Sequence, residues 1–191
     1  MDRLTYLYLK LQAITLLVLG RKRAALERFE AMQVLAPQNL YVMASRAHLR
    51  GELDDKQGAV EVLQEITRRN PDGSASWFNL GYMLDDMGRH LEAEPAFRRA
   101  LEAEPKMDRA WYGLALVLIR QRRFDEAIVA LRKNTELQPM SPFGWYQLAR
   151  VHVDRHEPEE AAKIIRHLHG FEPKVAAQLE RETGLRVAQG S

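Results

Sequence analysis

The sequence predicts an all-α protein built from five repeats of a helical hairpin, because three independent residue types recur at one spacing. Five prolines lie 34 residues apart, at Pro37, Pro71, Pro105, Pro139 and Pro173. The same step separates five alanines, Ala25, Ala59, Ala93, Ala127 and Ala161, and three tryptophans, Trp77, Trp111 and Trp145. Chance does not place three residue types in one register, so the chain is expected to fold as a stack of equivalent units.

The third repeat shows most clearly how the two helices of a unit are encoded. Residues at i, i+3, i+4 and i+7 predict one face of a first helix, at Trp77, Leu80, Gly81 and Leu84. Gly88 interrupts this pattern, and a second helix follows with one face at Ala93, Phe97 and Ala100. Pro105 ends the second helix, because proline disfavours helical geometry at the residue before it. We expect Gly81 and Ala93 to let the two helices approach closely, with Trp77 and Phe97 around the contact.

These residues closely resemble the tetratricopeptide repeat, a 34-residue helical hairpin with the same pattern of tryptophan, glycine, alanine, phenylalanine and proline. The resemblance places five units at 6–39, 40–73, 74–107, 108–141 and 142–175, within a single domain of residues 1–191. It implies a right-handed α-solenoid whose first helices line a concave groove. After Pro173, a capping helix is expected at about residues 175–183, followed by a frayed tail from Val187 to Ser191.

The second unit departs most from the repeat pattern. It has Arg46 and Arg50 where the third and fourth units have leucines. We therefore expect the first helix of this unit to be rotated, to be partly exposed, or to pair its arginines with a ligand or a neighbouring segment.

Composition favours a globular protein without a strongly charged surface. Apolar residues make up 46% of the chain and charged residues 28%, and the formal net charge is only +2. This balance argues against binding to nucleic acid or to an anionic membrane surface. The apolar stretch from Leu4 to Leu19 is interrupted by Lys10 and Gln12 and lacks a signal-peptide pattern, so no membrane insertion is expected. We predict a soluble, cytoplasmic protein, although the absence of cysteine is equally compatible with a periplasm.

No motif for catalysis or cofactor binding is present, so a non-enzymatic protein without a cofactor is predicted. The chain has no cysteine, and its glycines are dispersed rather than gathered in a phosphate-binding loop. His152 and His156 are spaced i, i+4 on one expected helix, and His167 and His169 follow on its partner. No glutamate completes the zinc-protease pattern between them. We expect His152 to be a packing residue and predict no metal site.

The resemblance implies that first-helix positions 2, 5, 6, 9, 12 and 13 face the concave groove. At these positions the predicted peptide-binding residues are Phe78, Asn79, Tyr82, Arg109, Tyr112, Phe143, Tyr146, Gln147 and Arg150. Tyrosine and arginine dominate binding hot spots, and aromatic residues are more frequent here than a solvated surface requires. We expect an extended or helical peptide of a partner protein to bind here. The alternative is that several of these aromatic residues pack between units.

The first helix differs from the others because it is apolar on every side. Its groove positions include Leu7, Leu11, Ile14, Leu17 and Val18, and its other positions are also rich in leucine. A helix that is apolar all round should be buried, yet the first helix of a solenoid has no preceding unit to bury it. Two explanations stay open, self-association through this end or docking of a hydrophobic partner helix. We favour a homodimer, because symmetric dimers are the commonest assemblies.

The sequence therefore predicts a protein-interaction scaffold or adaptor that binds a peptide or helix of another protein. The alternative is a tetratricopeptide-type chaperone for a secreted or membrane-assembled client, which the apolar first unit would suit. A third hypothesis is a regulatory subunit or a fragment of a larger enzyme. Fold alone does not choose between these functions.

Overall fold

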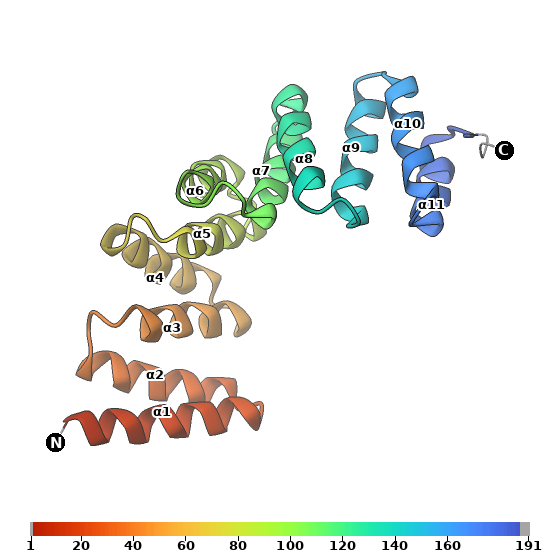
Figure 1. The fold of residues 1–191 in the computed structure, drawn as a ribbon. Helices are drawn as coiled ribbons and strands as arrows, with labels where there is room; N and C mark the ends of the chain where they lie inside the picture. Colours follow the sequence, from red (N-terminus) through yellow and green to blue (C-terminus); the bar gives the residue numbers. More distant parts are fainter. Residues whose placement is uncertain (1, 188–191) are drawn as a thin grey trace. The chain divides into compact units, whose positions relative to one another are not determined.

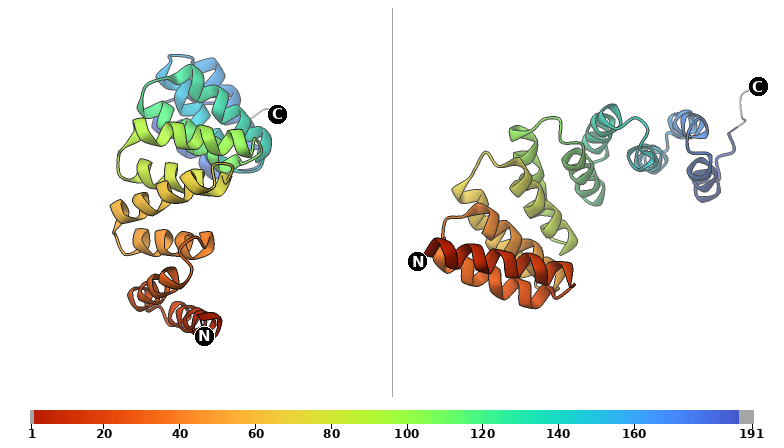
Figure 2. Two further views of the ribbon diagram at one scale, coloured as in Figure 1. Left: turned by 90° about the vertical axis from the view of Figure 1, so that its left-hand side faces the viewer. Right: turned by 60° about the horizontal axis from the view of Figure 1, so that its bottom comes forward.

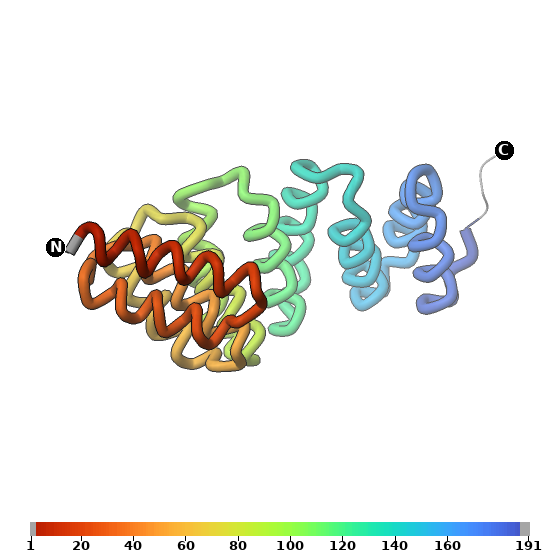
Figure 3. The backbone as a smooth tube through the Cα atoms, turned by 90° about the horizontal axis from the view of Figure 1, so that it is seen from below, coloured from red at the N-terminus to blue at the C-terminus, as the bar shows by residue number. Residues whose placement is uncertain are grey.

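The computed structural model describes residues 2–187, which form α-helices and no strands (Figure 1). In chain order the helices are α1 (Asp2–Val18), α2 (Lys22–Leu35), α3 (Leu40–Glu52), α4 (Lys56–Arg69), α5 (Ser74–Asp86), α6 (His90–Ala103), α7 (Asp108–Arg120), α8 (Phe124–Leu137), α9 (Pro142–Asp154), α10 (Pro158–His169) and α11 (Pro173–Thr183). Short connections join successive helices (Figures 2 and 3). The predicted all-α class is confirmed.

Two compact units divide the described residues between Ala103 and Glu104. The first unit contains the hairpins α1–α2, α3–α4 and α5–α6, in which α2 packs on α3 and α4 packs on α5. The second unit contains the hairpins α7–α8 and α9–α10, and α11 packs against α10 and α9. The chain is thus an α-solenoid of helix-turn-helix repeats, as predicted. The repeat boundaries and the single-domain description stay predictions.

The alanine period has a packing reason. The five alanines of the 34-residue series are all fully buried on second helices. Gly81 on α5 faces the buried ring of Phe97 on α6, and a Cβ atom added at Gly81 would lie only 2.9 Å from Phe97 Cδ1. The close approach expected at Gly81 therefore involves this aromatic ring.

Each tryptophan of the 34-residue series ties its helix to the connection before it. The indole Nε1–H donates to the carbonyl of the proline six residues earlier, at 2.7 Å from Trp77 to Pro71, 2.9 Å from Trp111 to Pro105 and 2.8 Å from Trp145 to Pro139. Indole N–H groups in packed positions need such a partner. The shared period of tryptophan and proline therefore reflects one hydrogen bond made three times.

The turn inside each hairpin contains one residue in the left-handed region. Its φ is 69° at Gly20, 67° at Asp54, 74° at Gly88, 59° at Arg122 and 60° at His156. The next backbone N–H donates to the carbonyl five residues earlier, as from Arg89 to Leu84 at 2.9 Å, which is the Schellman arrangement that ends a helix. Because His156 lies in this turn, beyond the end of α9 at Asp154, the expectation that it shares a helix with His152 is wrong.

The second hairpin accommodates its two arginines without losing its first helix. The α3 helix is regular from Leu40 to Glu52. Arg50 forms ion pairs with Glu30 on α2, at 3.2 Å, and with Asp55, at 3.5 Å. Of the three alternatives, pairing with a neighbouring segment therefore holds for Arg50. Burial, followed by the nearby charge of Arg50, lowers the pKa of the Arg46 guanidinium.

The C-terminal helix closes the stack of the second unit. Ala176 and Leu179 on α11 are fully buried, and the helix starts at Pro173, two residues before the expected position, and ends at Thr183, with Gly184 as its cap. Val187 is buried, and its backbone N–H donates to Glu180 Oε1 at 3.0 Å. The expectation of a frayed tail is wrong at Val187, because this contact holds it against α11. Residues 188–191 lie outside the described part of the chain.

Candidate protein-interaction surfaces

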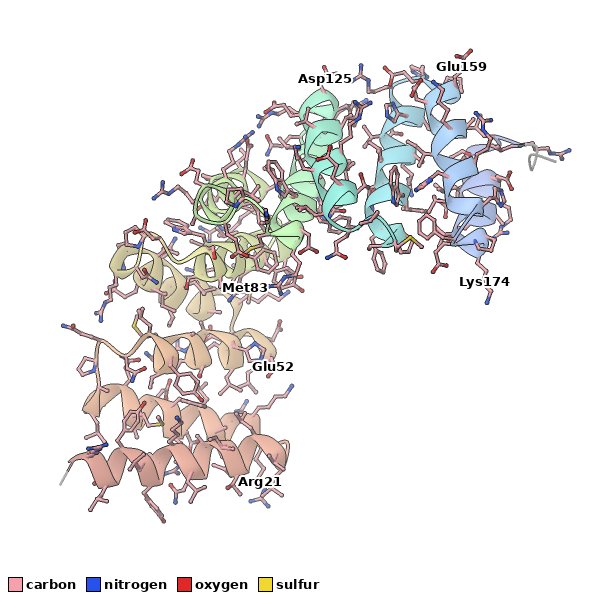
Figure 4. The ribbon with its side chains drawn as sticks, in the orientation of Figure 1. Arg21, Glu52, Met83, Asp125, Glu159 and Lys174 are labelled. Atoms are coloured by element: carbon pink, nitrogen blue, oxygen red, sulfur yellow. The ribbon has the colours of Figure 1, made fainter. Side chains whose placement is uncertain are left out.

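The predicted peptide-binding residues lie on three first helices, α5 in the first unit and α7 and α9 in the second. Five of them have exposed side chains, namely Asn79, Tyr82, Arg109, Phe143 and Arg150. The other four, Phe78, Tyr112, Tyr146 and Gln147, are half-buried. On the second helices the side chains that project into solvent include acidic ones, such as Asp125 on α8 and Glu159 on α10 (Figure 4).

On α5, Phe78 packs against the partner helix, whereas Tyr82 is exposed to solvent. The ring of Phe78 lies 6.0 Å from the buried ring of Phe97 and stacks on Tyr82 at 6.4 Å. Tyr82 itself is 59% exposed. One turn further along, Asp86 Oδ2 lies 2.7 Å from Lys56 Nζ, and this hydrogen bond raises the pKa of Lys56. Helix α5 therefore offers one exposed large aromatic side chain beside an ion pair.

The beginning of α9 carries the most exposed aromatic side chain of the predicted set. Phe143 follows Pro142 in the first turn of the helix and is 68% exposed. Met140, in the connection just before the helix, is exposed to a similar degree. Met140 was not predicted from the sequence, because it precedes the helix that carries the predicted residues. A methionine in a short connection was the sequence feature that could have indicated a contact residue, since the unbranched side chain of methionine adapts to varied partner surfaces.

Further along α9, two predicted residues are held by a carboxylate of the same chain. The hydroxyl of Tyr146 donates to Glu182 Oε2 on α11 at 2.5 Å. Arg150 Nη1 donates to the Tyr146 hydroxyl at 3.2 Å and lies 3.7 Å from Glu182 Oε2. The bonds from Tyr146 and from Gln178 lower the pKa of Glu182, so this carboxylate is ionised at neutral pH. Sequence reasoning missed Glu182 because it lies on the capping helix, outside the first-helix positions.

The histidines of the last hairpin serve packing and hydrogen bonding. His152 is buried, and its Nδ1 lies 2.7 Å from Glu157 Oε2. The ring of His167 lies 4.4 Å from Trp145 and 5.4 Å from Phe171. Across residues 2–187, no group of three or more histidine or acidic side chains is placed to hold a metal ion.

The first helix is buried on one side only. Ala13 is fully buried, and Tyr6, Leu9 and Leu16 pack partly buried against the core formed with α2 and α3. The residues predicted as a self-association face, Leu7, Leu11, Ile14, Leu17 and Val18, are all exposed. Within residues 2–187, every helix falls short of the length and hydropathy that crossing a lipid bilayer requires.

Comparison with known proteins agrees with this architecture. The sequence model of a tetratricopeptide repeat matches residues 44–90 and 84–142, together more than half of the 191-residue chain. Among solved structures, MamA (residues 41 to the end) from Desulfovibrio magneticus RS-1 gives a TM-score of 0.80 at 20% identity, over 93% of this chain and 96% of that one. YrrB, a TPR protein with an unusual peptide-binding site, gives 0.77 at 16% identity over 88% of each chain. Likeness at these identities establishes the fold alone. A search of curated proteins finds no match.

Proposed function

The chain belongs to the tetratricopeptide repeat family, and we propose that it is a non-enzymatic scaffold that binds a peptide or helix of a partner protein on its first helices. The observation that carries this proposal is the exposure of large aromatic side chains on these helices, Tyr82 on α5 and Phe143 on α9. Aromatic anchors supply much of the binding energy at protein interfaces, and helical repeats use such anchors to hold peptide segments.

We expect each of the two units to make its own contacts with a peptide. In the first unit they are Phe78, Asn79 and Tyr82, and in the second they are Arg109, Tyr112, Phe143, Tyr146, Gln147 and Arg150. The ring of Phe78 contacts both Tyr82 and Phe97, so we expect it mainly to support Tyr82. Tyr82 and Phe143 are therefore the side chains from which we expect most of the apolar contact.

The ion pair between Arg150 on α9 and Glu182 on α11 limits how much charge can contribute to peptide binding. Arg150 and Tyr146 already hold the carboxylate of Glu182. An acidic group of a peptide would have to displace that carboxylate, so it would exchange one ionic contact for another. We therefore expect affinity to depend on apolar peptide side chains that pack on Phe143 and the neighbouring Met140.

Truncation of the two anchors tests the proposal. Phe143→Ala and Tyr82→Ala are each expected to weaken binding of the display-selected peptides that bind the unit carrying the substitution, by about tenfold or more, the usual cost of removing an aromatic anchor. Fluorescence anisotropy with labelled peptides measures the affinity. Leu91→Ala on α6 and Val129→Ala on α8 are the matched controls, because both side chains are exposed and apolar but lie on second helices. Unchanged affinity in both anchor variants, or an equal loss in the controls, would contradict the proposal.

A second candidate function is a chaperone for a secreted or membrane-assembled client. The observation that favours it is the exposed apolar side of α1, which could cover an apolar segment of such a client. The two functions differ in what copurifies. A chaperone keeps one client from aggregating, whereas an adaptor joins two folded partners.

A further inference from the structure

The exposed apolar residues of α1 follow the spacing of a helix-pairing seam. Leu4, Leu7, Leu11, Ile14 and Val18 are separated by 3, 4, 3 and 4 residues, as are the a and d positions of paired helices. Their exposed fractions are 77%, 52%, 64%, 42% and 83%. Residues three and four apart share one side of a helix, so these five form a continuous line, which we call the α1 stripe. Buried Ala13 lies on the opposite side.

The α1 stripe is wide enough to support an interface. Three further exposed apolar side chains, Tyr8, Leu17 and Leu19, extend the surface around it. Eight large apolar side chains on one helix and its end expose an area on the order of the 800 Å² that each partner contributes to a standard interface. An open hollow of about 470 Å³ lies beside the stripe, between α1 and α2, and its lining includes Tyr8, Leu11 and Ala24. Side chains of a partner helix would have a place to insert.

From these observations we infer that two copies of the chain associate through their α1 stripes as an antiparallel helix pair. A two-fold dimer requires a surface that is complementary to itself, and a uniformly apolar stripe meets this requirement. This dimer would add a second peptide-binding chain to the proposed scaffold, but it does not depend on peptide binding.

Among the surfaces of the described residues, the α1 stripe of a second copy is the best match for the α1 stripe. Elsewhere the exposed large apolar side chains lie apart, as Leu91 on α6 and Val129 on α8, or form short groups without heptad spacing, one around the α2–α3 connection and one at Met140 and Phe143. The end helix of the second unit, α11, exposes polar residues such as Lys174, Gln178 and Arg181. A head-to-tail contact between copies would therefore set the apolar stripe against a polar surface.

Charge selects the antiparallel orientation. Between Arg3 and Val18, α1 contains the cations Arg3 and Lys10 and no carboxylate, and the basic run Arg21, Lys22 and Arg23 follows the helix. A parallel pair would bring the two basic runs together, whereas an antiparallel pair separates them by about the helix length, roughly 25 Å, and opposes the helix dipoles.

The heptad positions also select a register. When Leu11 packs against Ile14 of the second copy, and Leu7 against its Val18, Lys10 lies beside the second copy's Leu17 rather than beside its Lys10. The ammonium of Lys10 is in addition drawn aside within its own chain, 5.2 Å above the ring of Tyr41. In this register the two Lys10 ammonium groups do not face each other across the interface.

Light scattering coupled to size-exclusion chromatography tests the inference on the intact chain. The expected mass is twice the 22.0 kDa of one chain. Leu11→Glu and Ile14→Lys, measured separately, are each expected to weaken dimerisation at least 100-fold and to give monomers with unchanged circular dichroism. Val34→Glu on α2 is the matched control, because Val34 is even more exposed than Leu11 and Ile14 but lies off the stripe, and this variant should remain dimeric.

Mixing the two monomeric variants distinguishes the register. In the proposed pair the new carboxylate of one chain faces the new ammonium of the other, while Ile14 of the first faces Leu11 of the second. An equimolar mixture should therefore recover dimers. A monomeric intact chain at about 100 µM would overturn the inference and assign the stripe to a different partner helix. Dimers of Leu11→Glu, loss of the dimer in Val34→Glu, or failure of the mixture to reassociate would each overturn it as well.

Discussion

Arg46 and Arg50 occupy positions in α3 where the third and fourth repeats have leucine. Arg50 is compensated by Glu30 and Asp55. Arg46 is half-buried beside Arg50, and its Nε atom is buried without a hydrogen-bond partner among the described residues. A cation in this setting loses hydration and gains little in return. The repeat tolerates it because the remaining core of the hairpin is intact.

Arg46→Leu is therefore expected to stabilise the protein. We predict a rise of about 1 kcal/mol in the free energy of unfolding, because leucine adds apolar burial and removes a cation repelled by Arg50. Urea unfolding followed by circular dichroism measures the change. Arg50→Leu is the control, and it should bring a smaller gain or a loss, since it leaves Glu30 and Asp55 without their cation. A destabilised Arg46→Leu variant would show that Arg46 makes a favourable interaction here.

The hairpin turns show how one backbone geometry is built from different residues. Gly20 and Gly88 adopt the left-handed conformation at little cost, because they have no Cβ atom. Asp54 tolerates it, as aspartate often does. Arg122 and His156 have a Cβ atom as well, and the left-handed region costs such residues roughly 1–2 kcal/mol. The Schellman hydrogen bonds around the turn hold them there.

Glycine in these turns is expected to stabilise the second unit. Arg122→Gly and His156→Gly should each raise the free energy of unfolding by about 0.5–1 kcal/mol, the relief of backbone strain less the greater entropy of glycine in the unfolded chain. Thermal melts should show a rise of roughly 2–4 °C for each substitution. The reciprocal control, Gly88→Ala, should lower the melting temperature. No gain in either glycine variant would mean that the native side chains make compensating contacts.

Among the described residues, folding shifts the pKa of glutamate side chains more often than that of any other residue type. The pKa is lowered below its usual value of 4.5 in seven of them, Glu52, Glu65, Glu92, Glu157, Glu160, Glu180 and Glu182. The main cause in each is a hydrogen bond from a neighbouring group, such as Lys22 to Glu52, His152 to Glu157 or the backbone of Val187 to Glu180. Most of these donors are surface cations, so each pair contributes little alone.

Together these glutamates predict a stability that falls in acid. A carboxyl group with a lowered native pKa binds protons more readily in the unfolded state, so its contribution is complete above its unfolded pKa and is lost as the pH falls through the native value. The melting temperature should therefore be nearly constant from pH 7 to about pH 5 and then decrease below about pH 4.5. Calorimetry across this range, with and without 1 M NaCl, measures the effect, and salt should weaken it by screening exposed pairs. A melting temperature unchanged at pH 3 would contradict the prediction.

Much of the fold could be predicted because repetition and local chemistry encode it. The 34-residue steps of proline, alanine and tryptophan, the helical spacing around Gly81 and the break at Gly88 each depend on residues close together in the chain. Helix periodicity, turn geometry and proline act over a few residues, so a single sequence displays them directly. The apolar character of α1 was visible for the same reason.

The use of each surface residue depends on contacts between distant segments, and the sequence does not display these. Phe78 packs on Phe97, and Tyr146 and Arg150 bind Glu182, more than thirty residues further along the chain. Arg50 forms an ion pair with Glu30 on the preceding hairpin. Whether an apolar side chain of α1 faces the core or solvent likewise follows from how α2 and α3 pack against it. Such pairings are set by the packing of whole helices, because burial and ion pairing depend on three-dimensional distance, which spacing along the chain does not specify.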